Sequence, residues 1–225
     1  MKRAGVRAIR SAVWAAVLAG TLAGCVPLVV GGGMATTALS VADRRTTGTQ
    51  VEDQGIELRA QDRIALAMGD RSRTSVTSYN RKVLITGEVR NAQDKEEISR
   101  IVREVNNVDQ VFNEVEVVPF MSSISQRSKD TMLTGQVKAS LLNAKDLQGS
   151  AVKVVTELNV VYLMGIVTER ESRRAAEIAR GVNDVRKVVR LFEVTTEDAL
   201  ANYMPNNAPV TRDGTEQDVP PTSYR

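Results

Sequence analysis

The sequence has no histidine and a single cysteine, Cys25, among its 225 residues. A histidine-based catalytic triad, a zinc site of the usual histidine and cysteine kind, and an internal disulfide are therefore excluded. No nucleophile with an adjacent base can be identified, so we predict neither an enzyme nor a cofactor or metal site. Hydrophobic residues make up 42% of the chain, which is enough for one ordinary domain or two small ones.

The N-terminal apolar run, from Ala12 to Ala23, is too short to cross a bilayer, which takes about 20 apolar residues. Basic residues precede it, and it ends in Leu-Ala-Gly before Cys25. A basic end, a short apolar segment and small residues before a cleavage site are the parts of a secretory signal, so residues 1–24 are predicted to be removed.

The four residues ending at Cys25 also resemble the bacterial lipobox, in which the cysteine becomes the acylated N-terminus of the mature chain. The alternative is an ordinary cleaved signal that happens to contain a cysteine. Several acyl chains give a durable anchor, whereas one chain binds a membrane only marginally. Position 26 is valine, whereas lipoproteins retained at the inner membrane commonly have aspartate there. We therefore expect a lipid-anchored protein on the periplasmic face of the outer membrane.

The formal charge of +3 belongs largely to the signal segment. Removing residues 1–24 takes away four of the 30 basic residues and none of the 27 acidic ones, which leaves 26 minus 27, or −1. Export and this mature charge disfavour nucleic acid as a partner.

The two ends of the mature chain lack the apolar pattern of a folded domain. Residues 25–49 contain a run of glycines followed by small and threonine-rich sequence, which indicates a flexible tether. Residues 198–225 contain four prolines and few apolar residues, which predicts a disordered tail.

Between these ends lies an internal repeat. The apolar segment Lys82 to Val89 corresponds to Val160 to Val167, with Gly87 aligned to Gly165 at a spacing of 78. Val-Asn-Asn-Val at 105–108 then corresponds to Val-Asn-Asp-Val at 182–185. The chain is therefore predicted to contain two related domains, at 50–120 and 121–197.

Each repeat shows the same order of hydrophobic periods. A helical pattern is followed by two strands around an asparagine, a second helical pattern and an alternating strand. We predict an α+β fold of two tandem αββαβ units, each a small three-stranded mixed sheet with two helices on one face. The expected helices cover residues 52–68, 93–105, 129–142 and 170–182, and the last strand of the first unit is expected at 111–117. Gly87 and Gly165 are predicted to allow strand bending or close approach of a helix.

The apolar strand ending in Gly-x-Val, the helix after it and the Val-Asn-Asn-Val or Val-Asn-Asp-Val segment resemble the BON domain family, here in tandem behind a lipoprotein signal. The resemblance covers roughly residues 20–196. It implies binding of anionic phospholipid, a role in outer-membrane integrity and recruitment to division sites. In a similar family member, the first helix of the second domain contacts lipid headgroups, with tryptophan where this chain has Met132.

The charge of each domain favours the second as the one that meets a negative membrane. Residues 50–120 hold 10 basic and 13 acidic side chains, whereas residues 121–197 hold 12 and 9, a net +3. The expected lipid-contacting residues are Lys129, Met132, Leu133, Lys138 and Lys145. An alternative interpretation assigns Leu133, Val137 and Leu141 to the core, because they are spaced by four, and Met132 to core filling.

A second functional hypothesis is an envelope adaptor. It would bind a protein partner, such as the outer-membrane assembly machinery, through the acidic first domain or an exposed sheet edge. The sequence does not specify an oligomeric state.

Overall fold

The computed structural model describes residues 43–203. Cys25, the predicted signal peptide, most of the predicted tether and most of the predicted tail lie outside this part. Within it, the element order αββαβ occurs twice, as the repeat predicted, and we call the two copies the first and second modules. No helix in residues 43–203 is both long and apolar enough to cross a membrane.

The first module begins with a long helix and ends with a strand broken in two. Its elements are α3 (Thr47–Met68), the 3-10 turn η2 (Gly69–Arg71), β1 (Ser72–Tyr79), β2 (Lys82–Val89), α4 (Ala92–Arg103), β3 (Gln110–Asn113) and β4 (Glu116–Val117).

The second module repeats this order and is followed by one more helix. Its elements are α5 (Ile124–Asn143), the 3-10 turn η3 (Gly149–Ala151), β5 (Lys153–Glu157), β6 (Val160–Thr168), α6 (Glu169–Arg180) and β7 (Lys187–Thr195), after which comes α7 (Glu197–Tyr203).

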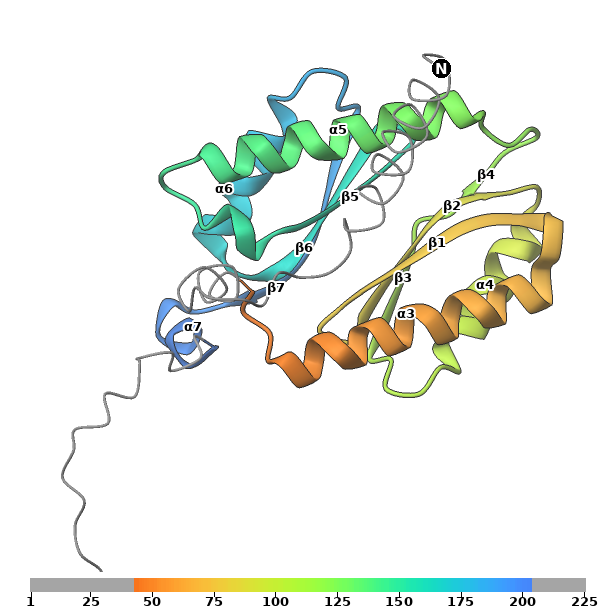
Figure 1. Cartoon of the computed structure of the whole chain (residues 1–225), viewed down its shortest axis with the longest axis horizontal. Coiled ribbons are helices and arrows are strands. Elements are labelled where there is room, and N and C mark those ends of the chain that lie inside the picture. Colours follow the sequence, from red (N-terminus) through yellow and green to blue (C-terminus); the bar gives the residue numbers. More distant parts are fainter. Residues whose placement is uncertain (1–42, 204–225) are drawn as a thin grey trace, which may run out of the picture. The chain divides into compact units, whose positions relative to one another are not determined.

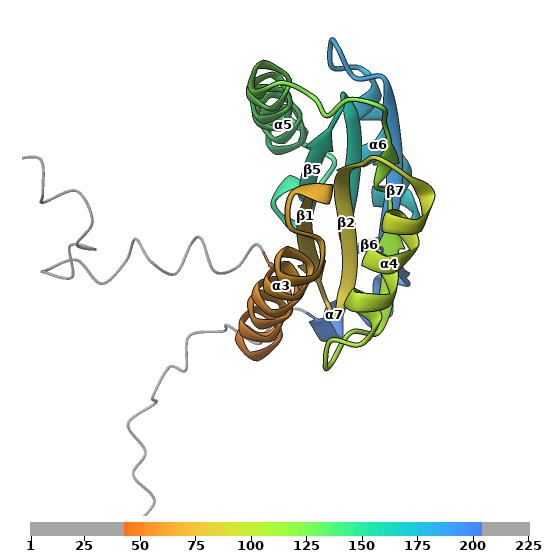
Figure 2. The ribbon, with the colours of Figure 1, turned by 90° about the vertical axis from the view of Figure 1, so that its right-hand side faces the viewer.

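Each module has a mixed sheet, as predicted. β1 pairs antiparallel with β2, which pairs parallel with β3 and β4. β5 and β7 flank β6 in the same way. The first helix of each module lies beside the edge strand β1 or β5, and the second helix lies beside the parallel pair (Figures 1 and 2). β1 and β5 are thus the strands with one free edge on the antiparallel side of their sheets.

The helices cover one face of each sheet and form its core. Ile56, Ala60 and Ile64 of α3 are almost fully buried against alternate residues of β2, such as Val83 and Ile85. In the second module, Leu133, Val137 and Leu141 of α5 pack in the same way. Apolar residues spaced by three or four in the helices therefore pack against apolar residues spaced by two in the strands, which gives each module one two-layer core.

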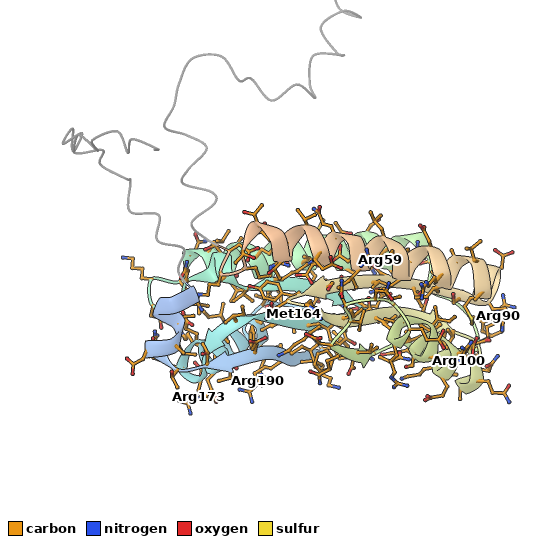
Figure 3. The ribbon with its side chains drawn as sticks, turned by 90° about the horizontal axis from the view of Figure 1, so that it is seen from below. Arg59, Arg90, Arg100, Met164, Arg173 and Arg190 are labelled. Carbon is orange, nitrogen blue, oxygen red and sulfur yellow. The ribbon has the colours of Figure 1, made fainter. Side chains whose placement is uncertain are left out.

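The helix-free faces are also buried, which the sequence analysis did not anticipate. Val160, Tyr162, Met164 and Ile166 of β6 form a third cluster that includes Leu84 of the first module. Met164 is 1% exposed and lies among the strands, whereas Arg90 and Arg173 point outward (Figure 3). Both modules therefore contribute to one continuous apolar layer within residues 43–203.

Gly87 and Gly165 have a structural role, as expected, and a different kind of neighbour approaches each of them. Both have positive φ, at 119° and 156°. A Cβ on Gly87 would collide with the backbone carbonyl of Arg73 in β1, and one on Gly165 with that of Ala151 before β5. Gly87 therefore allows the backbone of β1 to approach closely, and Gly165 allows the end of the 3-10 turn η3 to do so.

Two predicted boundaries are wrong where they meet the described residues. The segment 43–49 is not part of a tether, because α3 begins at Thr47 and the side chain of Arg44 is buried. At the other end, residues 198–203 belong to α7, and Leu200 packs into the apolar layer on the helix-free faces. The folded unit therefore extends beyond the repeat at both ends.

Candidate functional site

The candidate surface lies on α5, the first helix of the second module. The Ser123 side chain accepts a hydrogen bond from the Gln126 backbone N–H and so caps the start of the helix. Asp130, Leu133, Val137 and Leu141 are spaced by three or four residues and are buried. This buried stripe fixes the rotation of α5 about its axis, so the opposite side faces solvent.

The outward side of α5 combines apolar and cationic side chains. Met132 is 68% exposed and Leu142 is 62% exposed, and Gly135 leaves the surface between them low. An α-helix turns by about 100° per residue, which places Lys129 about 60° to one side of Met132 and Lys138 about 120° to the other. Both lysines are exposed, so they lie on the two flanks of this strip. The arrangement is an amphipathic outer surface with cations on both sides.

These cations have no acidic partner. Lys129 and Lys138, and also Lys145 in the loop after α5, make no ion pair or hydrogen bond through their side chains within residues 43–203. Asp130, the only acidic residue of α5, is buried and accepts backbone hydrogen bonds from Leu158 and Asn159. The exposed charge of α5 is therefore entirely positive.

The counterpart helix α3 lacks this property. α3 contains four acidic and two basic residues, a net −2, whereas α5 contains three basic and one acidic residue, a net +2. Arg59 of α3 also pairs with Glu52 at 2.7 Å. The two modules share a fold, but only the second presents a cationic helix.

The structure leaves four of the five residues that the sequence suggested exposed to solvent. Met132 lies on the outer side of α5 with Lys129 and Lys138 on its two opposite flanks, and Lys145 is exposed just beyond the end of the helix. Leu133 is a correction, because it is 4% exposed and packs in the core. Its spacing with Val137 and Leu141 indicated the core, and that interpretation is confirmed. Cys25 lies outside the described residues.

Sequence reasoning missed a buried charge cluster at the start of the folded unit. The Arg44 guanidinium donates to both carboxylate oxygens of Glu171 at 2.8 Å and to the Ile166 carbonyl at 2.7 Å. Burial alone raises the pKa of Glu171, but hydrogen bonds from Arg44 and the Thr168 backbone outweigh it and hold this pKa below its usual value. The signal was the charged run Asp-Arg-Arg at 43–45 inside otherwise small residues.

A BON domain model matches residues 52–119 and 129–196, which together make up more than half of the chain. The chain belongs to the BON family. It is 36% identical over 174 residues to the outer membrane lipoprotein DolP of Haemophilus influenzae, and the match covers 76% of this chain and 89% of that protein. This BON protein is accordingly a lipid-anchored outer-membrane protein.

Two further similarities are more distant. The BON chain is 30% identical over 152 residues to a 21 kDa hemolysin of Actinobacillus pleuropneumoniae, covering 67% of this chain and 78% of that protein. CdsD, a structural protein of the Chlamydia trachomatis type III secretion system, matches with 13% identity and a TM-score of 0.28, covering 68% of this chain and 96% of that one.

Proposed function

We propose that this lipoprotein binds anionic phospholipid through the outer side of α5 and thereby supports outer-membrane integrity. In this proposal, acylated Cys25 holds the chain at the membrane and α5 provides a second contact. The observation that carries the proposal is the unpaired Lys129 and Lys138 beside exposed Met132, a combination that α3 does not repeat.

The physical basis is the addition of a charge term and an apolar term. Each lysine close to an anionic leaflet contributes about 1 kcal/mol. Exposed Met132 and Leu142 can enter the boundary between headgroups and acyl chains, where apolar area leaves water. Neither term is large alone, so α5 is suited to reversible docking of a chain that is already anchored.

Most arginines of α6 are less available to lipid. On α6, Arg174 pairs with Asp146 at 2.8 Å and with Glu177 at 3.5 Å, and Arg173 lies 4.0 Å from Glu169. Binding phosphate there would require these arginines to exchange a carboxylate partner. The preference for α5 over α6 therefore rests on lysines without acidic neighbours that flank an exposed apolar residue, Met132.

Vesicle flotation with residues 26–225, free of acyl chains, tests the proposal. We expect binding to phosphatidylglycerol or cardiolipin vesicles that falls with salt and falls roughly 10- to 30-fold in Lys138→Glu. Lys187→Glu is the matched control, because Lys187 is exposed on β7 and the substitution changes the charge of the same module equally. Equal binding to neutral vesicles, or equal losses in both variants, would contradict the proposal.

A further inference from the structure

The free edges of β1 and β5 each present unpaired backbone groups. In an antiparallel ladder, alternate residues point their N–H and C=O away from the partner strand. The two-residue turns close the hairpins at the pairs Tyr79↔Lys82 and Glu157↔Val160. The closing pair Glu157↔Val160 is hydrogen-bonded, and so is every second pair before it. The residues in between, Val154 and Thr156 of β5, therefore direct their backbone groups outward.

The edge of β1 is partly satisfied, and that of β5 is not. The Thr74 carbonyl accepts from the Gln61 side chain at 3.2 Å, and the Ser78 carbonyl accepts from Lys153 Nζ at 3.0 Å. Within residues 43–203, the outward backbone groups of Val154 and Thr156 have no hydrogen-bond partner. β5 is therefore the edge that can accept another strand.

A groove of about 440 Å³ runs between these edges. It is lined by residues 73–75 of β1, residues 154–157 of β5 and the side of α5 that includes Arg127. Its volume falls in the range of protein ligand sites. Thr156 is only 9% exposed, and its Oγ1 has no hydrogen-bond partner in the described structure. A buried hydroxyl without a partner is costly, so it points to a polar group that the groove takes up.

The charge of the groove defines the kind of occupant. Arg73 donates to the Ser122 carbonyl, and neither Arg73 nor Arg127 lies within 4.0 Å of a carboxylate in residues 43–203. Asp130 is already occupied by backbone N–H groups of the β5–β6 turn. Burial, followed by the charges of Asp130 and Glu88, raises the pKa of Glu157 to about 7, which reduces its negative charge near neutral pH.

We propose that this groove binds an extended segment of a partner protein that carries an acidic side chain. The segment adds to β5 as a strand, pairing with the backbone of Val154 and Thr156, and its carboxylate lies between Arg73 and Arg127. A lipid phosphate could use the arginines, but it has no alternating donors and acceptors for a strand edge. The backbone geometry therefore favours a peptide, and the site adjoins the outer side of α5 without including Lys129, Met132 or Lys138.

The test uses residues 26–225, which contain the whole folded unit, and a labelled eight-residue peptide of alternating valine and threonine with one central aspartate. Fluorescence anisotropy measures its affinity, and amide NMR maps its site. We expect shifts at Val154 and Thr156, and at least tenfold weaker binding of the peptide with lysine in place of aspartate. Arg73→Glu and Arg127→Glu should each weaken binding about fivefold or more. Arg90→Glu, on an exposed arginine outside the groove, should not.

Two further comparisons isolate the backbone contribution. Thr156→Pro removes the outward N–H and should weaken binding at least fivefold, whereas Thr156→Val keeps that N–H. If Thr156→Pro loses the dispersed amide spectrum of a folded chain, a peptide N-methylated at alternate amides tests the same bonds without altering the protein. Unchanged affinity for that peptide, or a preference for lysine over aspartate, overturns the proposal.

Vesicle binding separates the two sites. Lys138→Glu should leave peptide affinity unchanged, and Arg73→Glu should leave vesicle binding unchanged. Loss of phosphatidylglycerol binding in Arg73→Glu, with no detectable peptide binding, would assign the groove to a lipid headgroup and overturn the peptide proposal while leaving an anionic-lipid function in place.

Discussion

Asp53 of α3 and Asp130 of α5 make the same contact in the two modules. The Asp53 carboxylate accepts from the backbone N–H groups of Asn80 and Arg81 at 2.8 Å, and the Asp130 carboxylate accepts from those of Leu158 and Asn159 at 3.1 and 2.9 Å. All four turn residues have positive φ. One buried carboxylate per module thus holds a strained two-residue turn against the first helix.

We predict that Asp53→Asn is more destabilising than Asp130→Asn. Asp53 also accepts from Ser78 Oγ and pairs with Arg45 at 2.6 Å, so its replacement leaves a largely buried guanidinium with one carboxylate fewer. The expected losses are about 3 kcal/mol for Asp53→Asn and about 1.5 kcal/mol for Asp130→Asn. Urea unfolding followed by circular dichroism measures both, and a reversed order would show that the turns do not depend on these carboxylates as described.

The Arg44–Glu171 pair should make the free energy of unfolding fall as the pH is lowered. The folded-state pKa of Glu171 is lowered, so its contribution is present above the unfolded pKa near 4.5 and is lost as pH falls through the folded pKa. Glu171→Gln should lower stability by about 3 kcal/mol at pH 7 and by much less in acid. Thermal unfolding from pH 7 to pH 3 gives this comparison. A constant difference across that range would assign the loss to packing instead.

Glu157 should produce the opposite pH dependence. Its folded-state pKa is raised from 4.5 to about 7, chiefly by burial, so the folded protein binds the extra proton and stability falls as pH rises from about 4.5 to 7. Glu157→Gln should remove this slope and gain about 1 kcal/mol at pH 8, a figure reduced for the partial exposure of the side chain. Carboxyl NMR titration measures the pKa directly, and a midpoint near 4.5 would contradict the expected desolvation.

Met132→Trp should tighten vesicle binding. Tryptophan favours the membrane interface more than methionine does, and Met132 is 68% exposed on the outer side of α5. Leu58→Trp is a matched control, since Leu58 is also 68% exposed but lies on the counterpart helix α3. Flotation should show several-fold stronger binding for Met132→Trp alone. An equal gain in both variants would mean that any exposed tryptophan suffices.

Much of the fold could be predicted because the spacing of apolar residues and the internal repeat indicate the same order of helices and strands. Ile56, Ala60 and Ile64 mark the buried side of α3 by spacing alone, and the alignment of Gly87 with Gly165 placed equivalent strands together. For the candidate site, the charge of the second domain and the family resemblance together pointed to α5 and its lysines, and their contact with lipid stays a prediction. It could not decide whether Met132 faced inward or outward, because that depends on the rotation set by the whole buried stripe.

The missed features depend on contacts between distant segments. β6 is apolar at nearly every position, a pattern typical of a strand that is buried on both faces. This pattern could have predicted the apolar layer on the helix-free faces. The strand expected at 111–117 is broken because the Asn113 side chain accepts from the Val115 N–H. α7 was hidden by a proline-rich context, although Thr196 followed by two acidic residues is a helix-start pattern.

The position of Arg44 has a mechanical consequence. The residue stands ahead of the first module in the chain, yet its buried partners, Glu171 and the Ile166 carbonyl, belong to the second. A force pulling on the chain ahead of residue 43 would therefore load the second module before it could unwind the first turn of α3. Arg44, at the start of the folded unit, is thus held by the same module that carries the cationic helix α5.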